Sequence, residues 1–311
     1  MRSYDHLASN EVAAVQEEQL EPEETAPSTA AEARPERHVP VPSVVRARER
    51  GKAASQRPLV LQTQMLTKVY GNLVAANNIS IEAREGSFVG VVGPNGAGKT
   101  TTLSMISGLN RPTSGRVLVG DVNVWKDGPA AKRLIGSLPD RLRLFDRLTG
   151  AQLLNYAGVL QGLDSQTVAS RADDLAQAFG LEGALGRAVQ SYSAGMQKKI
   201  ALACSMIHSP QLLVLDEPFE TIDPVSAANV TEILEKFVES GGSVVMSSHS
   251  LDLIQRVCDH VVVINDGDVI AQGSVDDVRD GMSLEERFAK LTQQNETERG
   301  LEWLHGSYDS E

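Results

Sequence analysis

The feature that most constrains this chain is a glycine-rich octet at residues 93–100, GPNGAGKT, which fits the pattern G-x-x-x-x-G-K-[ST]. Its glycines let the backbone curl so that successive N–H groups point at one anion. A compact apolar run precedes the octet and a helical pattern follows it, so a helix N-terminus adds positive potential. We expect a phosphate-binding loop, with a glycine-rich turn and a surface lysine as the alternative. The residues expected to bind nucleotide here are Gly93, Pro94, Asn95, Gly96, Ala97, Gly98, Lys99, Thr100 and Thr101, with Lys99 reaching the β- and γ-phosphates and the Thr100 hydroxyl ligating Mg²⁺.

A second polar motif lies where an apolar run, Leu212–Leu215, ends in two adjacent carboxylates. Asp216 is placed to hold Mg²⁺ through water, as in phosphate-loop NTPases generally. Glu217 is then placed to polarise an attacking water as a general base. The alternative is a buried strand that a polar turn terminates.

Apolar runs alternate with helical patterns through the middle of the chain. This alternation predicts an α/β domain with a largely parallel sheet. The interval Leu148–Ala188 carries helical patterns and no convincing strand, so we expect a helical insertion there. Strands are expected at Leu59–Lys68, Asn78–Ala83, Ser87–Val92, Arg116–Val119, Leu212–Leu215, Ser243–Met246 and Val261–Asn265, and helices at Thr100–Leu109 and Pro224–Glu239.

The two ends of the chain differ from its middle. Residues 1–58 hold few large apolar groups, so they bury too little surface to offset chain entropy, and we expect disorder. Within them, the basic stretch 46–52 is best interpreted as a solvated linker, with contact to an anionic membrane as the alternative. Near the other end, Ser283 and Glu286 have capping-box spacing and predict a helix over Ser283–Gln294. A polar tail, 295–311, follows.

Composition excludes several classes of protein. A formal net charge of −12 argues against a protein that coats nucleic acid, so no nucleic-acid partner is expected. No apolar run reaches the length of a membrane span, and residues 1–10 lack the layout of a signal peptide. Cys204 and Cys258 lie 54 residues apart, without metal-ligand spacing. We therefore expect a soluble, cytoplasmic chain.

Beyond the phosphate loop and the Asp216-Glu217 pair, four further elements make the sequence resemble the ABC-type ATPases. The segment 192–199, YSAGMQKK, resembles their signature motif, and His249 matches their switch histidine. Asp223 matches the aspartate of their D-loop, and Tyr70 the aromatic residue that stacks on adenine. The residues of the signature motif are similar to those in the ATPase subunits of ABC-2-type exporters. The short insertion and the ending, LEERF, resemble the same subunits. The resemblance covers roughly residues 59–294.

The resemblance implies a fold and a mechanism. The fold is the phosphate-loop NTPase fold of ABC ATPase type, with a β subdomain, a mostly parallel core sheet and a helical insertion at about 139–190. Two ATP molecules lie between head-to-tail subunits, so that Ser193 and Gly195 contact the γ-phosphate bound by the other subunit. His249 would contact the γ-phosphate and the attacking water. The structural alternatives are an ordinary N-cap for Ser193 and for Asp223, a turn histidine for His249 and a strand-end aromatic for Tyr70.

One position departs from the family pattern. Asp140 stands where the family usually has a glutamine, at the loop that enters the insertion. A carboxylate there can still ligate Mg²⁺ or water, but it adds negative charge beside the triphosphate. A smaller departure is Ala194 in place of a glycine.

Two functions follow as expectations. The first is the ATP-hydrolysing subunit of an exporter, held at the inner face of the cell membrane by a separate integral membrane permease and paired with a second ATPase subunit. A helix of that permease is expected to dock near residues 142–156. The second is a soluble ABC ATPase of translation, DNA repair or cofactor assembly. A single phosphate loop and the absence of sustained heptads favour the first.

Overall fold

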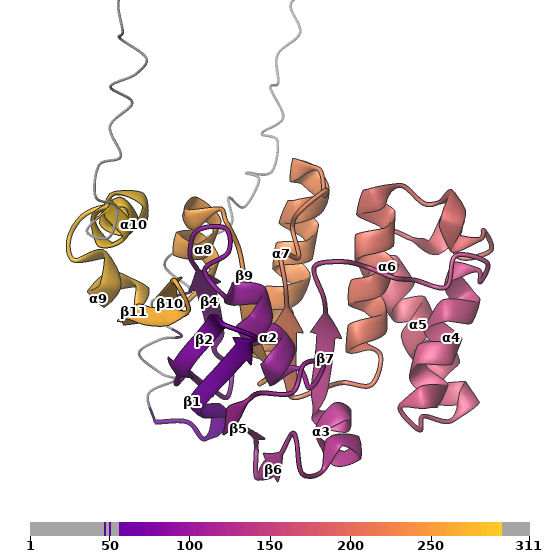
Figure 1. The fold of residues 1–311 in the computed structure, drawn as a ribbon. Helices are drawn as coiled ribbons and strands as arrows, with labels where there is room; N and C mark the ends of the chain where they lie inside the picture. The colour runs from indigo at the N-terminus through magenta and orange to yellow at the C-terminus, as the bar shows by residue number, and fades with distance from the viewer. Residues whose placement is uncertain (1–46, 48–49, 51–55, 294–311) are drawn as a thin grey trace, which may run out of the picture. The chain divides into compact units, whose positions relative to one another are not determined.

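The computed structural model of the protein describes Ala47, Arg50 and residues 56–293 (Figure 1). The expected disordered segment and polar tail lie almost wholly outside these residues. All described residues belong to one compact unit that Pro40–Glu311 contains.

A six-stranded sheet forms the centre of this unit, with strand order β11-β10-β4-β9-β8-β7. Every neighbouring pair is parallel except β10 and β11. The expected mostly parallel sheet is therefore confirmed, and its buried strands read as continuous apolar runs because both faces are covered. The strands are β4 (Phe88–Val92), β7 (Ile135–Leu138), β8 (Leu212–Leu215), β9 (Ser243–Ser247), β10 (His260–Asn265) and β11 (Asp268–Ser274).

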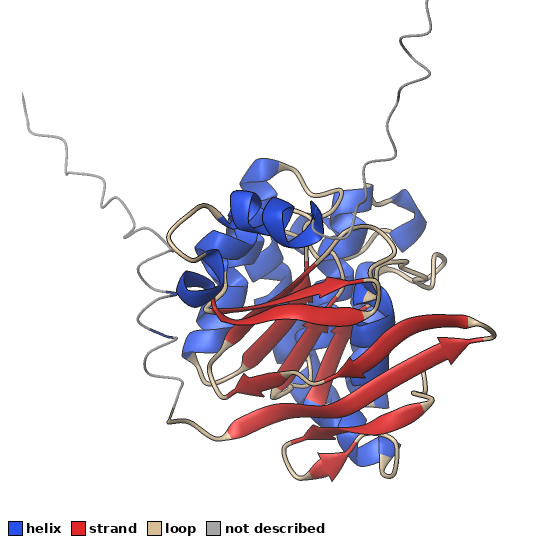
Figure 2. Cartoon of the chain, turned by 60° about the vertical axis from the view of Figure 1, so that its left-hand side comes forward, coloured by secondary structure: helices blue, strands red, loops and turns tan. Residues whose placement is uncertain are grey.

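A second, antiparallel sheet lies beside it and forms the expected β subdomain (Figure 2). The long strand β1 pairs with β2 along one part of its length and with β3 along another, and with β5 on its other edge. The strands are β1 (Leu59–Tyr70), β2 (Leu73–Ile79), β3 (Glu82–Arg84), β5 (Ser114–Val119) and β6 (Val122–Asn123).

The predicted strand Asn78–Ala83 is wrong as a single element. Strand β2 ends at Ile79 and β3 begins only at Glu82, because the side chain of Thr63 intervenes. Its hydroxyl donates to the Ile79 carbonyl at 3.2 Å and accepts the Ile81 N–H at 2.7 Å, and these bonds replace part of the regular ladder.

Helices cover the parallel sheet, and a group of them forms the insertion. Helices α4 and α5 contact each other and α6, and Figure 1 shows this group on the right, beyond β7. No strand occurs over Leu148–Ala188, as expected, and the single bridge joins Thr149 to Ala188. The helices are α2 (Lys99–Ile106), α3 (Gly128–Leu134), α4 (Gly150–Leu160), α5 (Ser165–Phe179), α6 (Ala194–Met206), α7 (Pro224–Glu239), α8 (Leu251–Val257), α9 (Val275–Arg279) and α10 (Leu284–Gln293), with 3₁₀ turns at Glu182–Ala184 and Val189–Ser191.

The predicted C-terminal helix is confirmed as α10, and so is its capping box. The Glu286 N–H donates to the Ser283 hydroxyl at 3.1 Å, and the Ser283 N–H donates to the Glu286 carboxylate at 3.1 Å. These reciprocal bonds satisfy two of the donors that a helix start leaves free.

Two hydrophobic clusters hold the layers together. One lies between the antiparallel sheet, helix α2 and the near face of the parallel sheet, and includes Leu61, Val91 and Ile106. The other joins the opposite face to the insertion, and includes Leu154 and Leu213. Strand β4 contributes to both clusters, so the chain that enters the phosphate loop is fixed from both sides.

Two expectations from composition are answered for the described residues. None of their helices combines the length and the hydropathy that crossing a bilayer requires. Cys204 and Cys258 are free thiols, and burial raises the pKa of Cys204 to about 12 and the pKa of Cys258 well above its ordinary value.

Candidate functional site

The glycine-rich octet joins the end of β4 to the start of α2, as the sequence predicts. Gly98, the N-cap of α2, has φ 105°, and a Cβ atom there would lie 2.3 Å from the Ala75 carbonyl oxygen. At Gly93 a Cβ atom would lie 2.2 Å from the Ile264 carbonyl oxygen. Larger residues are excluded at both positions, so the tight loop depends on these glycines.

The Lys99 side chain folds back over this loop. Its ammonium donates to the carbonyl oxygens of Gly93 and Pro94, at 2.8 and 3.1 Å. The side chain is largely buried, with the residue 9% exposed. These contacts hold the cation inside the loop, where a bound phosphate would meet it.

Asp216 and Glu217 follow β8, and Ser247 at the end of the neighbouring β9 connects them. The Ser247 hydroxyl donates to the Asp216 carboxylate at 2.5 Å and accepts the Glu217 N–H at 2.9 Å. Asp216 is 4% exposed. Parallel strands end at one edge of a sheet, and this explains why the two acidic residues and the serine meet.

The Glu217 side chain points at His249, which follows β9. The His249 Nδ1 atom lies 3.0 Å from Glu217 Oε2. The backbone of Glu217 has φ 47°, a strained value for a non-glycine residue, and its carbonyl oxygen accepts a bond from the Lys198 ammonium at 3.0 Å. Lys198 is 3% exposed. Sequence reasoning did not single out Lys198 or Ser247 as residues of the site.

These groups surround a pocket of about 450 Å³. Its polar lining combines the cation of Lys99 with the carboxylates of Asp140, Glu217 and Glu220. Glu220 also lines the pocket, although the sequence motifs do not predict it. The only sequence feature that could have pointed to it is its position three residues after Glu217. The full lining is Tyr70, Leu73, Ala75, Asn95, Gly96, Ala97, Gly98, Lys99, Thr100, Thr101, Asp140, Glu217, Glu220 and His249.

Tyr70, at the end of β1, lines the pocket with an exposed ring. The residue is 47% exposed, its hydroxyl is bonded to the Asn110 side chain, and the Lys68 ammonium lies 5.0 Å from the ring centroid. The neighbouring Leu73 is 65% exposed. An aromatic face beside an apolar side chain at the rim of a polar pocket suits the flat face of a base.

Six predicted residues are not among those that line this pocket: Gly93, Pro94, Asp216, Ser193, Gly195 and Asp223. Gly93 and Pro94 begin the phosphate loop and Asp216 is buried after β8, whereas the other three belong to the starts of α6 and α7. Ser193 is the N-cap of α6 and accepts the Met196 N–H at 3.3 Å. Asp223 is the N-cap of α7, and the Ser226 N–H, together with other local donors, lowers the pKa of its carboxyl group. A Cβ atom at Gly195 would lie 3.3 Å from the Thr221 carbonyl oxygen, so the start of α6 packs against the segment that leads to Asp223.

The candidate metal ligands Thr100, Asp140 and Asp216 all carry oxygen donors, the type that Mg²⁺ prefers. Thr100 and Asp140 line the pocket, and Asp216 lies buried at the end of β8. Among the described residues, no group of three or more His, Cys, Asp or Glu side chains is arranged as a metal site by itself. The oxygen atoms of Thr100, Asp140 and Asp216 are of the type that suits Mg²⁺.

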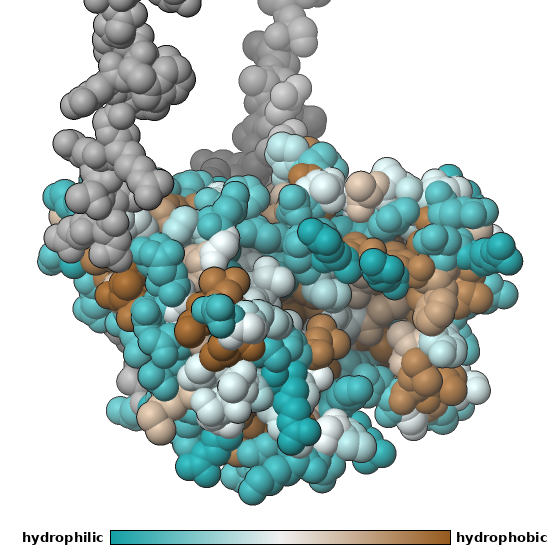
Figure 3. All heavy atoms as spheres, viewed as in Figure 1, coloured by the Kyte–Doolittle hydropathy of each residue, from teal (hydrophilic) through white to brown (hydrophobic). Residues whose placement is uncertain are grey.

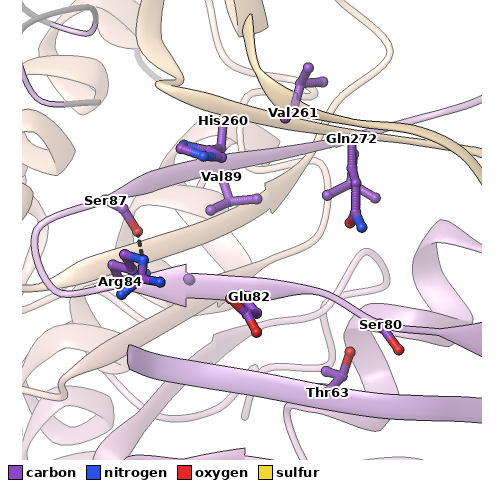
Figure 4. Close-up of a pocket in the computed structure, with 12 residues that line it drawn as sticks. Thr63, Ser80, Glu82, Arg84, Ser87, Val89, His260, Val261 and Gln272 are labelled. Carbon is purple, nitrogen blue, oxygen red and sulfur yellow. Dashed lines mark hydrogen bonds between the residues drawn. The ribbon is translucent and has the colours of Figure 1, made fainter. Parts of the chain in front are cut away.

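A second pocket, of about 280 Å³, lies at the opposite end of β4 (Figure 4). The figure shows Glu82 and Arg84 on one side and His260 and Gln272 on the other, with Val89 between. The Arg84 N–H donates to the Ser87 hydroxyl at 3.0 Å, and Gln62 donates to the Glu82 carboxylate at 3.4 Å. None of the predicted site residues belongs to this pocket.

Comparisons with known proteins agree with this geometry. The family model described as "ABC transporter" matches residues 76–220. The linearmycin resistance ATP-binding protein LnrL of Bacillus subtilis is 34% identical over 219 residues, 70% of this chain and 70% of that protein. The Nod factor export ATP-binding protein I of Cupriavidus metallidurans is 32% identical over 214 residues, 69% of this chain and 71% of that protein. A solved ATP-binding subunit of an ABC transporter superposes with a TM-score of 0.71 at 28% identity, over 75% of this chain and 99% of that one.

Proposed function

The chain belongs to the ABC transporter family as an ATP-binding subunit, and from this premise we propose that it hydrolyses ATP to drive export by a separate permease. The observation that carries the proposal is the contact between Glu217 and His249 at the wall of the pocket that the phosphate loop forms. A carboxylate and an imidazole beside a triphosphate site are the groups that water attack requires.

Nucleotide binding follows from the lining of the pocket. The N–H groups of the loop and the start of α2 bind phosphate oxygens, and the Lys99 ammonium exchanges its two carbonyl partners for the β- and γ-phosphates. Tyr70 stacks on the adenine at the rim. Each contact uses a residue that already lies in the pocket.

For hydrolysis, Glu217 accepts a proton from the attacking water, and His249 orients both that water and the γ-phosphate. The Ser247 and Lys198 bonds fix the backbone of Glu217, so its carboxylate keeps one position. Thr100, Asp216 and Asp140 would hold Mg²⁺, which neutralises charge on the phosphates when bound. Asp216 is held for this role by the short bond from Ser247.

The active form is a head-to-tail dimer. Ser193 and Gly195 lie outside the pocket of their own chain, and Ser193 marks the positive N-terminus of α6. A second subunit, identical or homologous, would place that N-terminus against the γ-phosphate. ATP binding then closes the dimer, and hydrolysis releases it.

Coupling to the permease uses the insertion. Phe145 and Tyr156 are 56% and 44% exposed, and their rings meet edge to face with centroids 5.4 Å apart. Val159 and Leu160 continue this exposed apolar surface along α4. Figure 3 shows hydrophobic side chains gathered on the right, over α4 and α5. We infer that a short helix of an integral membrane permease docks here and holds the chain at the inner face of the cell membrane.

The test is co-purification of the Glu217→Gln variant from solubilised membranes with ATP present. This variant should stay closed and retain its partner, so a polytopic protein should come down with it. The matched control is Lys99→Ala, which cannot close. If no polytopic protein accompanies Glu217→Gln, the exporter proposal fails and a soluble ABC ATPase takes its place.

A further inference from the structure

The buried carboxylate of Asp259, just before β10, plays no part in the nucleotide site. Its side chain is 0% exposed. Its two oxygens accept the Phe88 N–H at 3.0 and 3.1 Å, and its own N–H donates to the Phe88 carbonyl oxygen at 3.0 Å. A carboxylate that is buried while ionised requires a cation nearby as well as hydrogen bonds.

The cation is the guanidinium of Arg50, which precedes the predicted start of the domain at residue 59. The Arg50 Nε atom lies 3.8 Å from Asp259 Oδ2, with 11% of the Arg50 side chain exposed. The Arg50 Nη2 atom donates to the Val257 carbonyl oxygen at 2.7 Å. Ala47 has helical conformation, as Arg50 does, and is 2% exposed. Both described residues of this stretch therefore have little contact with solvent.

We propose that Ala47 and Arg50 belong to an arm that docks on the ATPase unit, with Asp259 as its binding site and Arg50 as its anchor. The basic stretch 46–52 was expected to be a solvated linker, with an anionic membrane as its alternative partner. A guanidinium that is nearly buried and bonded to Val257 is available to neither solvent nor lipid. The arm therefore has an intramolecular partner.

The other basic group at Asp259 does not replace Arg50. His260 Nδ1 lies 3.7 Å from Asp259 Oδ1, but 43% of the His260 side chain is exposed, and it lines the second pocket (Figure 4). A histidine carries charge only when protonated, whereas arginine is always charged. Among the described residues, the Nε and Nη1 atoms of Arg50 have no hydrogen-bond partner, so charge attraction rather than a direct hydrogen bond holds the pair.

The position of the anchor connects the arm to both halves of the nucleotide site. Val257 ends α8, a helix that starts two residues after His249. Phe88 begins β4, which ends at Val92 directly before the phosphate loop. The arm thus fixes the end of α8 and the start of β4, the two ends that lie away from the nucleotide site.

A double-mutant cycle tests the pair. Arg50→Met keeps the aliphatic stem and removes the charge, and it should lower Tm by about 6 °C or more because it leaves Asp259 buried without its cation. Asp259→Asn should also lower Tm, and the double variant should lose less than the sum of the two single losses. Arg50→Lys should recover part of the loss. Arg133→Ala removes an exposed positive charge from α3 and should leave Tm within 1 °C of the unsubstituted protein, as a surface change does. Additive losses, or equal losses from Arg133→Ala and Arg50→Met, would overturn the proposal.

Proteolysis gives a second readout that does not depend on the folding of Asp259→Asn. The protease Glu-C cuts after Glu49, next to the anchor. In the full chain this bond should be cut about tenfold more slowly than in Arg50→Met, because the arm must undock first. Adding phosphatidylglycerol vesicles to the digestion tests the alternative partner, an anionic membrane. If the unsubstituted protein is cut after Glu49 as fast as Arg50→Met, the arm is undocked and the proposal is overturned. Faster cleavage when vesicles are added would overturn it as well.

Discussion

The His249 imidazole and the Glu217 carboxylate are in direct contact, with 3.0 Å between Nδ1 and Oε2. The two side chains differ in exposure, 69% for His249 and 17% for Glu217. A partly buried carboxylate beside an exposed imidazole suits a general base whose partner reaches toward a ligand. This contact links the ends of two neighbouring strands, and it makes the role of each residue separately testable.

Glu217→Gln should bind ATP with nearly unchanged affinity and lower ATP turnover by about 10²–10⁴-fold, because an amide cannot accept the proton of water. The measurements are phosphate release and nucleotide affinity on the same preparation. The variant should also accumulate as an ATP-bound dimer by light scattering. Ordinary turnover in Glu217→Gln would remove this residue as the base.

Lys99→Ala should lower ATP affinity by about 100-fold or more, because it removes a charge-assisted contact with two phosphates. Equilibrium binding of a fluorescent ATP analogue measures this loss. Lys132→Ala on α3 is the matched control, since this lysine does not line the pocket. Unchanged affinity in Lys99→Ala would contradict the assignment of the phosphate loop.

Whether the sequence predicts a strand depends on how far the two faces of that strand are buried. The strands β4, β8 and β10 were found because both of their faces are apolar. Strand β11 was missed because its residues are only partly buried and it follows β10 after a two-residue turn. The break between β2 and β3 depends on the hydroxyl of Thr63, a residue 16 positions away from Ile79. Such a contact leaves no periodic signal.

The same holds for the site. Motif spacing predicted residues that belong to one short motif, such as Lys99 or Glu217, although it missed Glu220. It did not predict Ser247, which supports Glu217 from 30 residues away, or Lys198, which does so from 19. These contacts exist only after the sheet has brought strand ends together. The Arg50–Asp259 pair, 209 positions apart, is the extreme case.

Ser247→Ala should weaken hydrolysis more than ATP binding, because its hydroxyl bonds both the Asp216 carboxylate and the Glu217 N–H. We expect a fall in turnover of about tenfold with a small change in affinity, as the loss of one or two hydrogen bonds implies. Ser248→Ala is the control for the neighbouring hydroxyl, which accepts the Ser250 N–H instead. Equal losses in the two variants would show a general effect of the turn.

Asp140→Gln should keep or raise ATPase activity, because it removes a negative charge from the pocket and restores the amide usual at this position. Affinity for ATP without Mg²⁺ should rise, since Asp140, Glu217 and Glu220 all repel the free triphosphate. Asp173→Asn, on the exposed part of α5, controls for net charge. A complete loss of activity in Asp140→Gln would assign the carboxylate a catalytic role of its own.

His208 should make the fold less stable in mild acid. Burial lowers the pKa of this imidazole below its ordinary 6.5, and its Nε2 atom lies 3.2 Å from the Ile135 carbonyl oxygen. Its Nδ1 atom is buried, and none of the described residues forms a hydrogen bond with it. As pH falls below 6.5, the unfolded chain binds a proton that the folded chain does not, so stability is lost until the lower, folded pKa is passed. The loss is at most about 1.4 kcal/mol per pH unit. Urea unfolding at pH 7.5, 6.5 and 5.5 should show that the free energy of unfolding falls less steeply in His208→Gln than in the unsubstituted protein. An identical slope in the two proteins would contradict the assignment.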